Sequence, residues 1–448
     1  MYHSNPSIKL EDLLSSCAGP FSNEKQAKNA WSMLKSAPLA VLTASMRNNA
    51  DPLSHLDPAG APILYLAVLN ARLRVHNPNY NVLLHAASHF VHTAAWNQLQ
   101  VAPEFAFYFA QGLAELALNA PSTIPMQQSA LTILEPLQYL CAYMGGSRGR
   151  FTPVHPILAK FSLLAKHPKA ALPCLDIDIT EIETHASHLR YQDFLLYHYY
   201  GGMIYLQLKN FERALDFFTL TIAAPATVAS AIQIEAHRKY ILASLLLLGK
   251  VPSLPKYTAQ PVSRALKNTN TPYDDFAKAY ESLNITRLQT EVSKHQDLFN
   301  KHKNWGLVTQ LMDSLVRRNI QKLTQTYLTL SLSDMAKSVG IDTPQEAERH
   351  VLQMIEEGQV YATINHREGG MVYFRDAPNR FDDEETVRRF EREIAEAHVI
   401  AKRVEKLDRS LALTKEYQGK VVGGERAGAA GLGGMMAAFN DDEILIDG

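Results

Sequence analysis

Helical periodicity runs through residues 24–302, well over half of this 448-residue chain, and strand signals are nearly absent there. Segments such as 105–118 and 191–209 place apolar residues on one face at the spacing of an α-helix. Short polar or proline-marked breaks separate these segments, and residues 249–272, with four prolines, are predicted to form a loop. Because each short amphipathic helix must bury its apolar face against its neighbours, we predict a mainly α solenoid of helical repeats over residues 24–302.

One repeat-like unit stands out in the stretch HYYGGMIYLQLKNFERALDFFTLTI, which begins at residue 198. Its small and large packing residues fall at the offsets of a tetratricopeptide (TPR) repeat, at Gly202, Tyr205, Ala214 and Phe218. Glycine lets two helices approach closely, and the aromatic side chains fill the groove between them. Since only this copy matches the pattern well, we predict a degenerate array of TPR-like repeats.

Residues 303–376 carry the order of elements typical of a winged helix. A long amphipathic helix leads to a short strand at YLTLSL, followed by a helix that Ser333 opens and Gly340 ends. Thr343 and Pro344 then open a second helix with the signature of an N-terminal cap. The runs VYATIN and MVYF, joined by the turn HREGG, predict a β-hairpin.

The second of these helices lies where a DNA-binding winged helix places its reading helix, so its charge decides what it can bind. Its polar face carries four carboxylates and one arginine, a net charge of −3, on Gln345, Glu346, Glu348, Arg349, His350, Gln353, Glu356 and Glu357. A reading helix needs cations and amides toward phosphates and bases, and carboxylates repel the phosphate backbone. We therefore expect no nucleic-acid site on this helix.

A long charged helix is predicted over residues 385–413. Apolar residues recur on it by threes and fours, forming a narrow seam: Val387, Phe390, Ile394, Ala397, Ala401, Val404 and Leu411. A seam over more than three heptads favours a helical partner in an assembly, although the helix could also fold back on its own solenoid. Residues 414–448, rich in glycine and alanine and then acidic, are predicted to be disordered, and residues 1–23 to be partly flexible.

Bulk properties exclude several classes of protein. The net charge of −1 provides no field that favours nucleic acid or acidic lipid. Three widely spaced cysteines form neither a disulfide framework nor a zinc pattern, which fits a reducing compartment. The N-terminus lacks the apolar core of a signal peptide, and no apolar run is long enough to cross a bilayer. We expect an intracellular soluble protein.

Searches for chemistry find no catalytic site and no cofactor site. The chain has no GxxxxGK[ST] phosphate loop, no GxSxG nucleophile elbow and no glycine fingerprint after a strand. His85, His89 and His92 lie at helical spacing and could ligate zinc, which would make the chain a metal-dependent enzyme. No neighbouring Asp, Glu or Cys completes such a site in the sequence, so we expect no metal there.

A helical-repeat region that leads into a winged helix and a long C-terminal helix resembles the PCI family, which serves the proteasome lid, the COP-nine signalosome and translation initiation factor three. Within that family, the stretches RRNIQKLTQTYLTLSLSDMAKSVG, EAERHVLQMIEEGQVYATIN and GGMVYF look closely like the third-subunit family of the signalosome. The resemblance is strongest over residues 304–374 and extends over most of residues 1–411. The glycine- and alanine-rich tail departs from the family pattern.

The resemblance implies a non-catalytic scaffold subunit in the nucleus and cytoplasm. Its complex removes the ubiquitin-like modifier Nedd-eight from cullins and so controls cullin–RING ubiquitin ligases, with the catalytic zinc in a separate JAMM-containing subunit. Other PCI subunits would pair with the sheet edge of the winged helix, expected at Leu328, Leu330, Val360, Tyr361, Met371, Val372, Tyr373 and Phe374. The C-terminal helices of the subunits would gather in a bundle that covers the seam.

Two alternatives remain open at this point. In the same architecture, the chain would be a PCI subunit of the proteasome lid or of the initiation factor. In a different class, it would be a winged-helix regulator that binds nucleic acid, with affinity falling steeply as salt rises.

Overall fold

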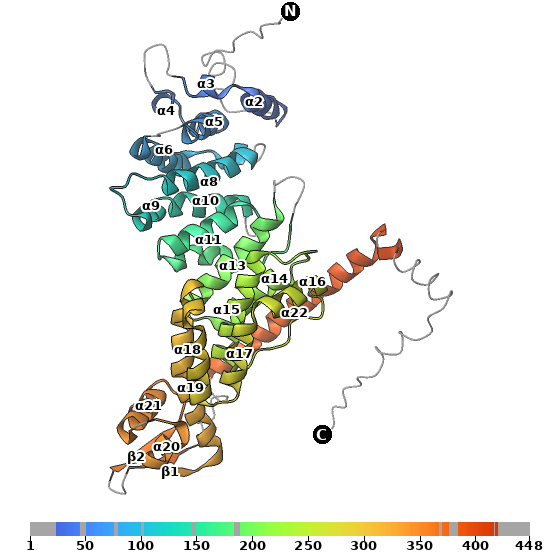
Figure 1. Ribbon diagram of the computed structural model, residues 1–448. Coiled ribbons are helices and arrows are strands. Elements are labelled where there is room, and N and C mark those ends of the chain that lie inside the picture. The colour runs from blue at the N-terminus through green and yellow to red at the C-terminus, as the bar shows by residue number, and fades with distance from the viewer. Residues whose placement is uncertain are drawn as a thin grey trace, which may run out of the picture. The chain divides into compact units, whose positions relative to one another are not determined.

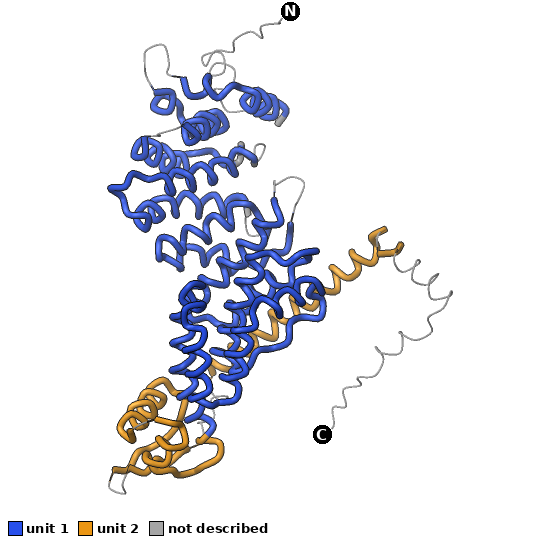
Figure 2. Tube along the Cα trace, viewed as in Figure 1, with its two compact units in different colours: residues 1–322 blue, residues 323–448 orange. Residues whose placement is uncertain are grey.

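The computed structural model describes residues 24–44, 51–75, 79–99, 103–145, 149–182, 189–341, 343–366, 370–375, 384–415 and 417–419. These fall into two compact units, unit 1 within residues 1–322 and unit 2 within residues 323–448 (Figure 2). The predicted flexible segment 1–23 and nearly all of the predicted tail 414–448 lie outside the described residues. Among the described residues, every helix is too short or too polar to cross a membrane.

Unit 1 is a stack of helices that follow one another along the chain (Figure 1). They are α2 (Glu24–Ser36), α3 (Leu39–Leu42), α4 (Pro52–His55), α5 (Pro62–Leu73), α6 (Tyr80–Thr93), α7 (Trp96–Leu99), α8 (Pro103–Leu118), α9 (Met126–Thr132), α10 (Leu134–Gly145), α11 (Val154–Leu164), the 3-10 helix η2 (Pro168–Ala171), α12 (Leu172–Leu175), α13 (Tyr191–Gln207), α14 (Phe211–Ala223), α15 (Ala231–Leu248), α16 (Gln260–Thr269), α17 (Thr271–Glu281), α18 (Ile285–Lys301) and α19 (Trp305–Thr326). The prediction of a mainly helical repeat region is confirmed.

Helix α16 corrects the loop predicted for residues 249–272. It carries Pro261 in its first turn, where the missing N–H is harmless, and it buries Val262 and Leu266. The four prolines therefore mark the start of helices as well as the connection before them.

The pair α13 and α14 packs as the TPR-like pattern predicted. Tyr205, Ala214 and Phe218 are buried, and a Cβ added to Gly202 would lie only 2.6 Å from Cε1 of Phe218. Gly201 approaches the ring of Phe217 equally closely. Neither position has room for a side chain, so the two glycines set the distance between the helices.

Two side chains, the buried Gln233 and the partly buried Arg318, close helix ends from the next layer of the stack. The Gln233 side chain of α15 donates to the last carbonyls of α14, including that of Ala224 at 3.1 Å. Arg318 of α19 donates to the carbonyls of Leu246 and Leu247 at 2.9 and 3.0 Å, at the end of α15. The last carbonyls of a helix have no partner within it, so these contacts satisfy groups that burial would otherwise leave unpaired.

The core of unit 1 extends further along the chain than predicted. A second hydrophobic cluster joins α15, α17, α18 and α19, and it buries Phe276, Phe299, Val308, Leu311 and Leu315. Because these α19 residues complete that cluster, unit 1 runs to residue 322. The predicted domain boundary at residue 303 therefore falls inside a compact unit.

Unit 2 holds a small winged helix and one long helix. Its elements are β1 (Thr329–Ser331), α20 (Leu332–Val339), α21 (Pro344–Glu356), β2 (Ala362–Asn365), β3 (Met371–Phe374) and α22 (Glu384–Ala412). The three strands form an antiparallel sheet in the order β1-β3-β2. Leu330, Val372 and Ile364 lie side by side across this sheet, with Val372 fully buried, so this row belongs to the covered face.

Local capping explains where the helices of unit 2 begin and end. Ser331 caps α20 by accepting from the Asp334 amide at 3.1 Å, two residues before the predicted start at Ser333. Thr343 caps α21 by accepting from the Glu346 amide at 3.3 Å, as predicted. Gly340 ends α20 with a φ of 77°, a left-handed conformation that glycine adopts at low cost.

Candidate functional site

The sheet of the winged helix has two outer strands, and only part of the predicted edge lies on them: Leu330 belongs to the outer strand β1. Strand β3 pairs with β1 on one side and with β2 on the other. Met371, Val372, Tyr373 and Phe374 therefore occupy the central strand, and the prediction that they form an edge is wrong. The short strand β1 pairs with β3, on the side opposite β2. The sequence pattern alone did not reveal which strand of the hairpin β1 would pair with.

Strand β1 offers one of the two outer edges. The Phe374 amide donates to the Leu328 carbonyl at 2.9 Å, and the Leu332 amide donates to the Gly370 carbonyl at 2.9 Å. Residues alternate in an antiparallel ladder, so the N–H and C=O groups of Thr329, between these bonds, point away from β3. Within the described part of the chain no further strand pairs with this edge. Leu328 stands beside it, 81% exposed.

Strand β2 forms the other outer edge. The Arg375 amide donates to the Tyr361 carbonyl at 2.7 Å, and by the same alternation the backbone groups of Ala362 and Ile364 point outward. Val360 was predicted to lie at this edge, but its side chain is only 5% exposed and belongs to the core. An edge of this kind can add a strand from another chain.

Helix α21 presents a carboxylate-rich surface. Its apolar stripe of Ala347, Val351 and Met354 is buried, which leaves Glu346, Glu356 and other polar residues exposed. Glu348 lies 3.3 Å from His366, so this acidic residue is partly neutralised when the histidine is protonated. The remaining charge still opposes a phosphate backbone.

All seven predicted seam residues of α22 are exposed in this chain. Val387 is 46% exposed, and Ile394 and Val404 are each 58% exposed. The whole helix has no buried residue. Pairs one turn apart, such as Arg389 with Glu393 at 2.8 Å, support the helix from its charged faces. The apolar seam is therefore not covered by the other described elements of unit 2.

The apolar stripe of α22 is wider than the predicted seam. Ile400 and Leu407, 59% and 60% exposed, lie one turn before and one turn after Val404, and Leu411 follows Leu407 by four residues. A two-stranded coiled coil needs only a narrow stripe, whereas a wider one contacts more than one neighbour. The predicted seam passes from Ala397 to Val404 through Ala401. Ile400 also lies three residues after Ala397 and four before Val404, and it was left out because only one residue was assigned to that turn.

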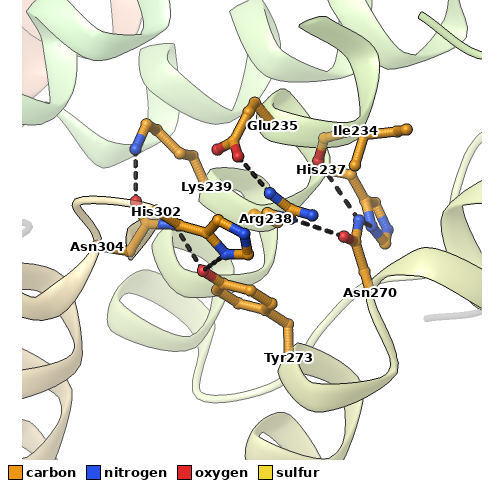
Figure 3. A network of polar contacts seen from close by, with 9 residues as sticks. All are labelled: Ile234, Glu235, His237, Arg238, Lys239, Asn270, Tyr273, His302 and Asn304. Atoms are coloured by element: carbon orange, nitrogen blue, oxygen red, sulfur yellow. Dashed lines mark hydrogen bonds and ion pairs between the residues drawn. The ribbon is translucent and has the colours of Figure 1, made fainter. Parts of the chain in front are cut away.

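A buried polar network lies in unit 1 where α15 faces the ends of later helices (Figure 3). Arg238 pairs with Glu235 and donates from Nε to Asn270 Oδ1 at 2.9 Å. Asn270 in turn donates from Nδ2 to His237 Nδ1 at 2.9 Å and to the Ile234 carbonyl at 3.4 Å. Asn270 is fully buried between α16 and α17, so all its bonds are made within the protein.

The second half of the network reaches α19. Lys239 Nζ lies 2.5 Å from Asn304 Oδ1, and both residues are buried. Asn304 Nδ2 donates to the Tyr273 hydroxyl at 2.8 Å, and this hydroxyl lies 3.1 Å from His302 Nδ1. The run HRK in an otherwise apolar helix is the sequence signal that would have located this network.

Burial controls the charges of this network. It lowers the pKa of His237 to about 4, so the ring is neutral and its Nδ1 can accept from Asn270. Burial also lowers the pKa of Lys239, while nearby Glu235 opposes this effect. These directions describe a structural network, because its buried groups hydrogen-bond to one another.

The three histidines at helical spacing lie exposed on α6. His85, His89 and His92 share that helix, and His92 Nε2 lies 3.2 Å from Glu135 of α10. The sequence did not show this carboxylate. Among the described residues, no group of three or more potential ligands is arranged to hold a metal ion.

Comparison with known proteins decides the family. The model for the N-terminal helical repeats of COP9 signalosome complex subunit 3 matches residues 25–262, more than half of the chain, and the PCI domain model matches residues 276–376. The chain belongs to the COP9 signalosome subunit 3 family. The predicted resemblance is confirmed, and the PCI match begins within α17, well before the predicted winged-helix boundary at residue 303.

Two members of the subunit 3 family show how far the similarity extends. The COP9 signalosome complex subunit 3 of Drosophila melanogaster is 38% identical over 291 residues, which cover 62% of this chain and 65% of that protein, just under two thirds. The subunit of the same name in Dictyostelium discoideum is 31% identical over 380 residues, covering 84% of this chain and 88% of that protein.

The polar network joins the two regions that the family models match. Its α15 residues lie in the helical-repeat match and His302 and Asn304 lie in the PCI match, with Asn270 between them. In this member of the subunit 3 family, the helical repeats and the first helices of the PCI domain therefore share one packed unit.

Proposed function

We propose that this chain is a non-catalytic scaffold subunit of a COP9 signalosome and supports removal of Nedd-eight from cullins. Membership of the subunit 3 family carries this proposal. The complex would regulate cullin–RING ubiquitin ligases in the nucleus and cytoplasm. The catalytic zinc site would belong to another subunit of the JAMM type, so this chain would contribute surfaces for assembly.

The stripe on α22 is the first of these surfaces. Ile394, Ile400, Val404 and Leu407 are all more than half exposed on a helix with no buried residue. Covering such side chains releases about 25 cal/mol for each Å² of apolar surface removed from water. Helices of neighbouring PCI and JAMM subunits, packed as a bundle, would cover this width of stripe.

The outer strands of the winged helix are the second surface. We assign the contact with other PCI subunits to the outward backbone groups of Thr329 on β1 or of Ala362 and Ile364 on β2. Strand addition pairs N–H and C=O groups that otherwise face water, and it requires no particular side chain. This replaces the central strand β3 as the site of contact.

A pull-down with two matched variants tests the α22 surface. The first variant, Ile394→Asp with Val404→Asp, places two carboxylates in the stripe. The control, Arg392→Asp with Lys402→Asp, places them on the opposite face and changes the net charge more. Tagged full-length proteins are recovered from native lysate, and the eluates are analysed by mass spectrometry and for cullin deneddylation.

We expect the wild-type protein and the control variant to recover JAMM subunits and other PCI subunits, and we expect their eluates to remove Nedd-eight from cullins. The stripe variant should lose both while its own thermal unfolding stays unchanged, because burying unpaired charge disrupts only the bundle. Equal losses in both variants would contradict a role of the stripe, and a destabilised stripe variant would mean that α22 packs on its own chain. Recovery of proteasome or initiation-factor subunits would move the chain to one of those complexes.

Proline substitutions test the edge of β1. Thr329→Pro removes an N–H that points outward and leaves the pairing of β1 with β3 intact, whereas Leu330→Pro removes an inward one. If strand addition uses β1, Thr329→Pro should weaken recovery of PCI subunits without lowering the stability of the chain. Full recovery would shift the contact to β2, where Ile364→Pro repeats the test.

A further inference from the structure

A pocket of about 550 Å³ in unit 1 contains two cysteine side chains. Its lining includes Cys141 and Cys174 together with the apolar residues Ile177 and Ile179. His155 also faces the pocket, and burial lowers its pKa to about 4, so this histidine is neutral at physiological pH. The assembly surfaces of the winged helix and α22 make no use of this pocket.

The two cysteines come from different helices that pack together. Cys141 lies on α10 and is 1% exposed, whereas Cys174 lies on α12 and is partly exposed. Gln138, one turn before Cys141, donates to the Ala170 carbonyl at 2.6 Å and holds η2 against α10. The Tyr197 hydroxyl donates to the carbonyl of Cys174 at 3.4 Å. These bonds fix the helices that bring both cysteines to the lining of the pocket.

The two thiols form a hydrogen-bonded pair with unequal roles. Hydrogen bonding between the two thiols lowers the pKa of Cys174 and raises the pKa of Cys141, and burial raises the pKa of Cys141 further. A thiolate is the reactive form of cysteine, and reactivity also requires access. Cys174 is partly exposed and has the lowered pKa, whereas Cys141 is buried.

We propose that Cys174 is an oxidation site for hydroperoxides that enter this pocket and that Cys141 then forms a disulfide with it. The geometry provides a partly exposed cysteine, a second cysteine lining the same pocket and a cavity large enough for small molecules. The lining carries one charged side chain, Arg150, among apolar and neutral polar residues, which suits hydrogen peroxide or a small organic hydroperoxide.

The chemistry balances in two steps. The Cys174 thiolate attacks one peroxide oxygen, the O–O bond breaks, and water leaves after protonation, so sulfur is oxidised to a sulfenic acid as peroxide is reduced. The Cys141 sulfur then attacks the Cys174 sulfur, the S–O bond breaks, and a second water leaves with the thiol proton. Two thiols and one hydrogen peroxide give one disulfide and two waters.

The disulfide would tie α10 to α12 across one wall of the solenoid. A cross-link removes conformations from the unfolded chain, so the oxidised protein should unfold at a higher temperature than the reduced one. Thiol reductants should reverse this shift. The bond would therefore stiffen the solenoid without touching the winged helix.

The test uses full-length protein carrying Cys17→Ser, so that only the two pocket cysteines remain. Reduced protein is treated with hydrogen peroxide, denatured, alkylated with N-ethylmaleimide, digested without reductant and analysed by mass spectrometry. We expect a peptide cross-linked between Cys141 and Cys174, loss of both free thiols per chain, and full reversal by dithiothreitol.

Two single variants separate the roles of the cysteines. With Cys141→Ser, Cys174 should stop at the sulfenic acid and be labelled by dimedone. With Cys174→Ser, Cys141 should stay reduced and alkylatable. Circular dichroism checks that each serine variant is folded. The proposal is overturned if both pocket cysteines remain alkylatable after peroxide has fully oxidised an added small thiol, or if Cys141 reacts without Cys174.

Discussion

The ammonium group of Lys239 lies 2.5 Å from Oδ1 of Asn304, although 65 residues separate them in the chain. Both side chains are buried. The amide nitrogen of Asn304, Nδ2, donates to the Tyr273 hydroxyl at 2.8 Å. A buried ammonium is costly unless its protons find acceptors. This contact therefore links the helical repeats to the start of α19 through a group that would be destabilising alone.

A double-mutant cycle measures that link. Asn304→Ala leaves the Lys239 ammonium without this acceptor and should lower the free energy of unfolding by about 2–4 kcal/mol. In a chain that already carries Lys239→Met, the same substitution should cost distinctly less, since no buried cation remains. Urea denaturation of the four proteins checks this. Equal costs in both backgrounds would show that the contact contributes no coupling.

Substitution of Gly202 tests the close approach of α13 and α14. A Cβ at this position would lie 2.6 Å from the buried ring of Phe218, so Gly202→Ala should destabilise the protein by about 1–3 kcal/mol. Gly306 in α19 is the control, because a Cβ there meets nothing within 4 Å. Gly306→Ala should be neutral or stabilising, since alanine favours a helix. Thermal unfolding that ranks the two variants equally would contradict the packing argument.

Acid should weaken the solenoid through its buried histidines. Burial lowers the pKa of His155, His198 and His237 to about 4. In the unfolded chain histidine titrates near 6.5, so between those values the unfolded state binds protons that the folded state does not. The contribution of these histidines to the free energy of unfolding is therefore complete above about pH 6.5, and it is lost as the pH falls toward 4.

His198→Gln isolates one of these contributions. Between pH 7 and pH 5 the wild-type protein should lose about 2 kcal/mol more stability than this variant, because a neutral glutamine binds no proton. Urea titrations at a series of pH values measure the difference. Parallel curves for wild type and His198→Gln would exclude this linkage.

Arg318 should contribute to stability through the end of α15. Its guanidinium donates to several of the last carbonyls of that helix, so Arg318→Met should cost about 1.5–3 kcal/mol. The exposed Arg264 on α16 provides the control, and Arg264→Met should change stability by less than about 0.5 kcal/mol. Chemical denaturation of both variants compares them. A small effect at Arg318 would mean that water replaces it at these carbonyls.

Periodicity was enough to predict the architecture, because apolar spacing and capping residues act locally. Gly202 with Phe218, and Thr343 at the start of α21, were placed correctly on these grounds. Ser331 was missed as a cap because two further hydroxyl and carboxylate residues follow it within three positions. Any of these three residues can cap a helix, and only the backbone conformation selects one.

The remaining errors concern contacts between residues distant in sequence. The order β1-β3-β2 depends on which side of the hairpin Thr329 and its neighbours occupy, and residue types do not encode this. Arg318 donates to carbonyls of α15 more than 70 residues earlier in the chain, and nothing in the sequence around Arg318 indicates that partner. The pairing of Lys239 with Asn304 is of the same kind, since either residue alone resembles an ordinary surface residue.

Helix α22 has 29 residues, which gives it a length of roughly 43 Å. Its apolar stripe stays in water for as long as nothing covers it, and exposed stripes of that kind drive molecules of one protein to adhere to one another. Production of this chain and of the helices that cover α22 must therefore remain matched in amount. Any surplus would be cleared or would aggregate, however well each copy had folded.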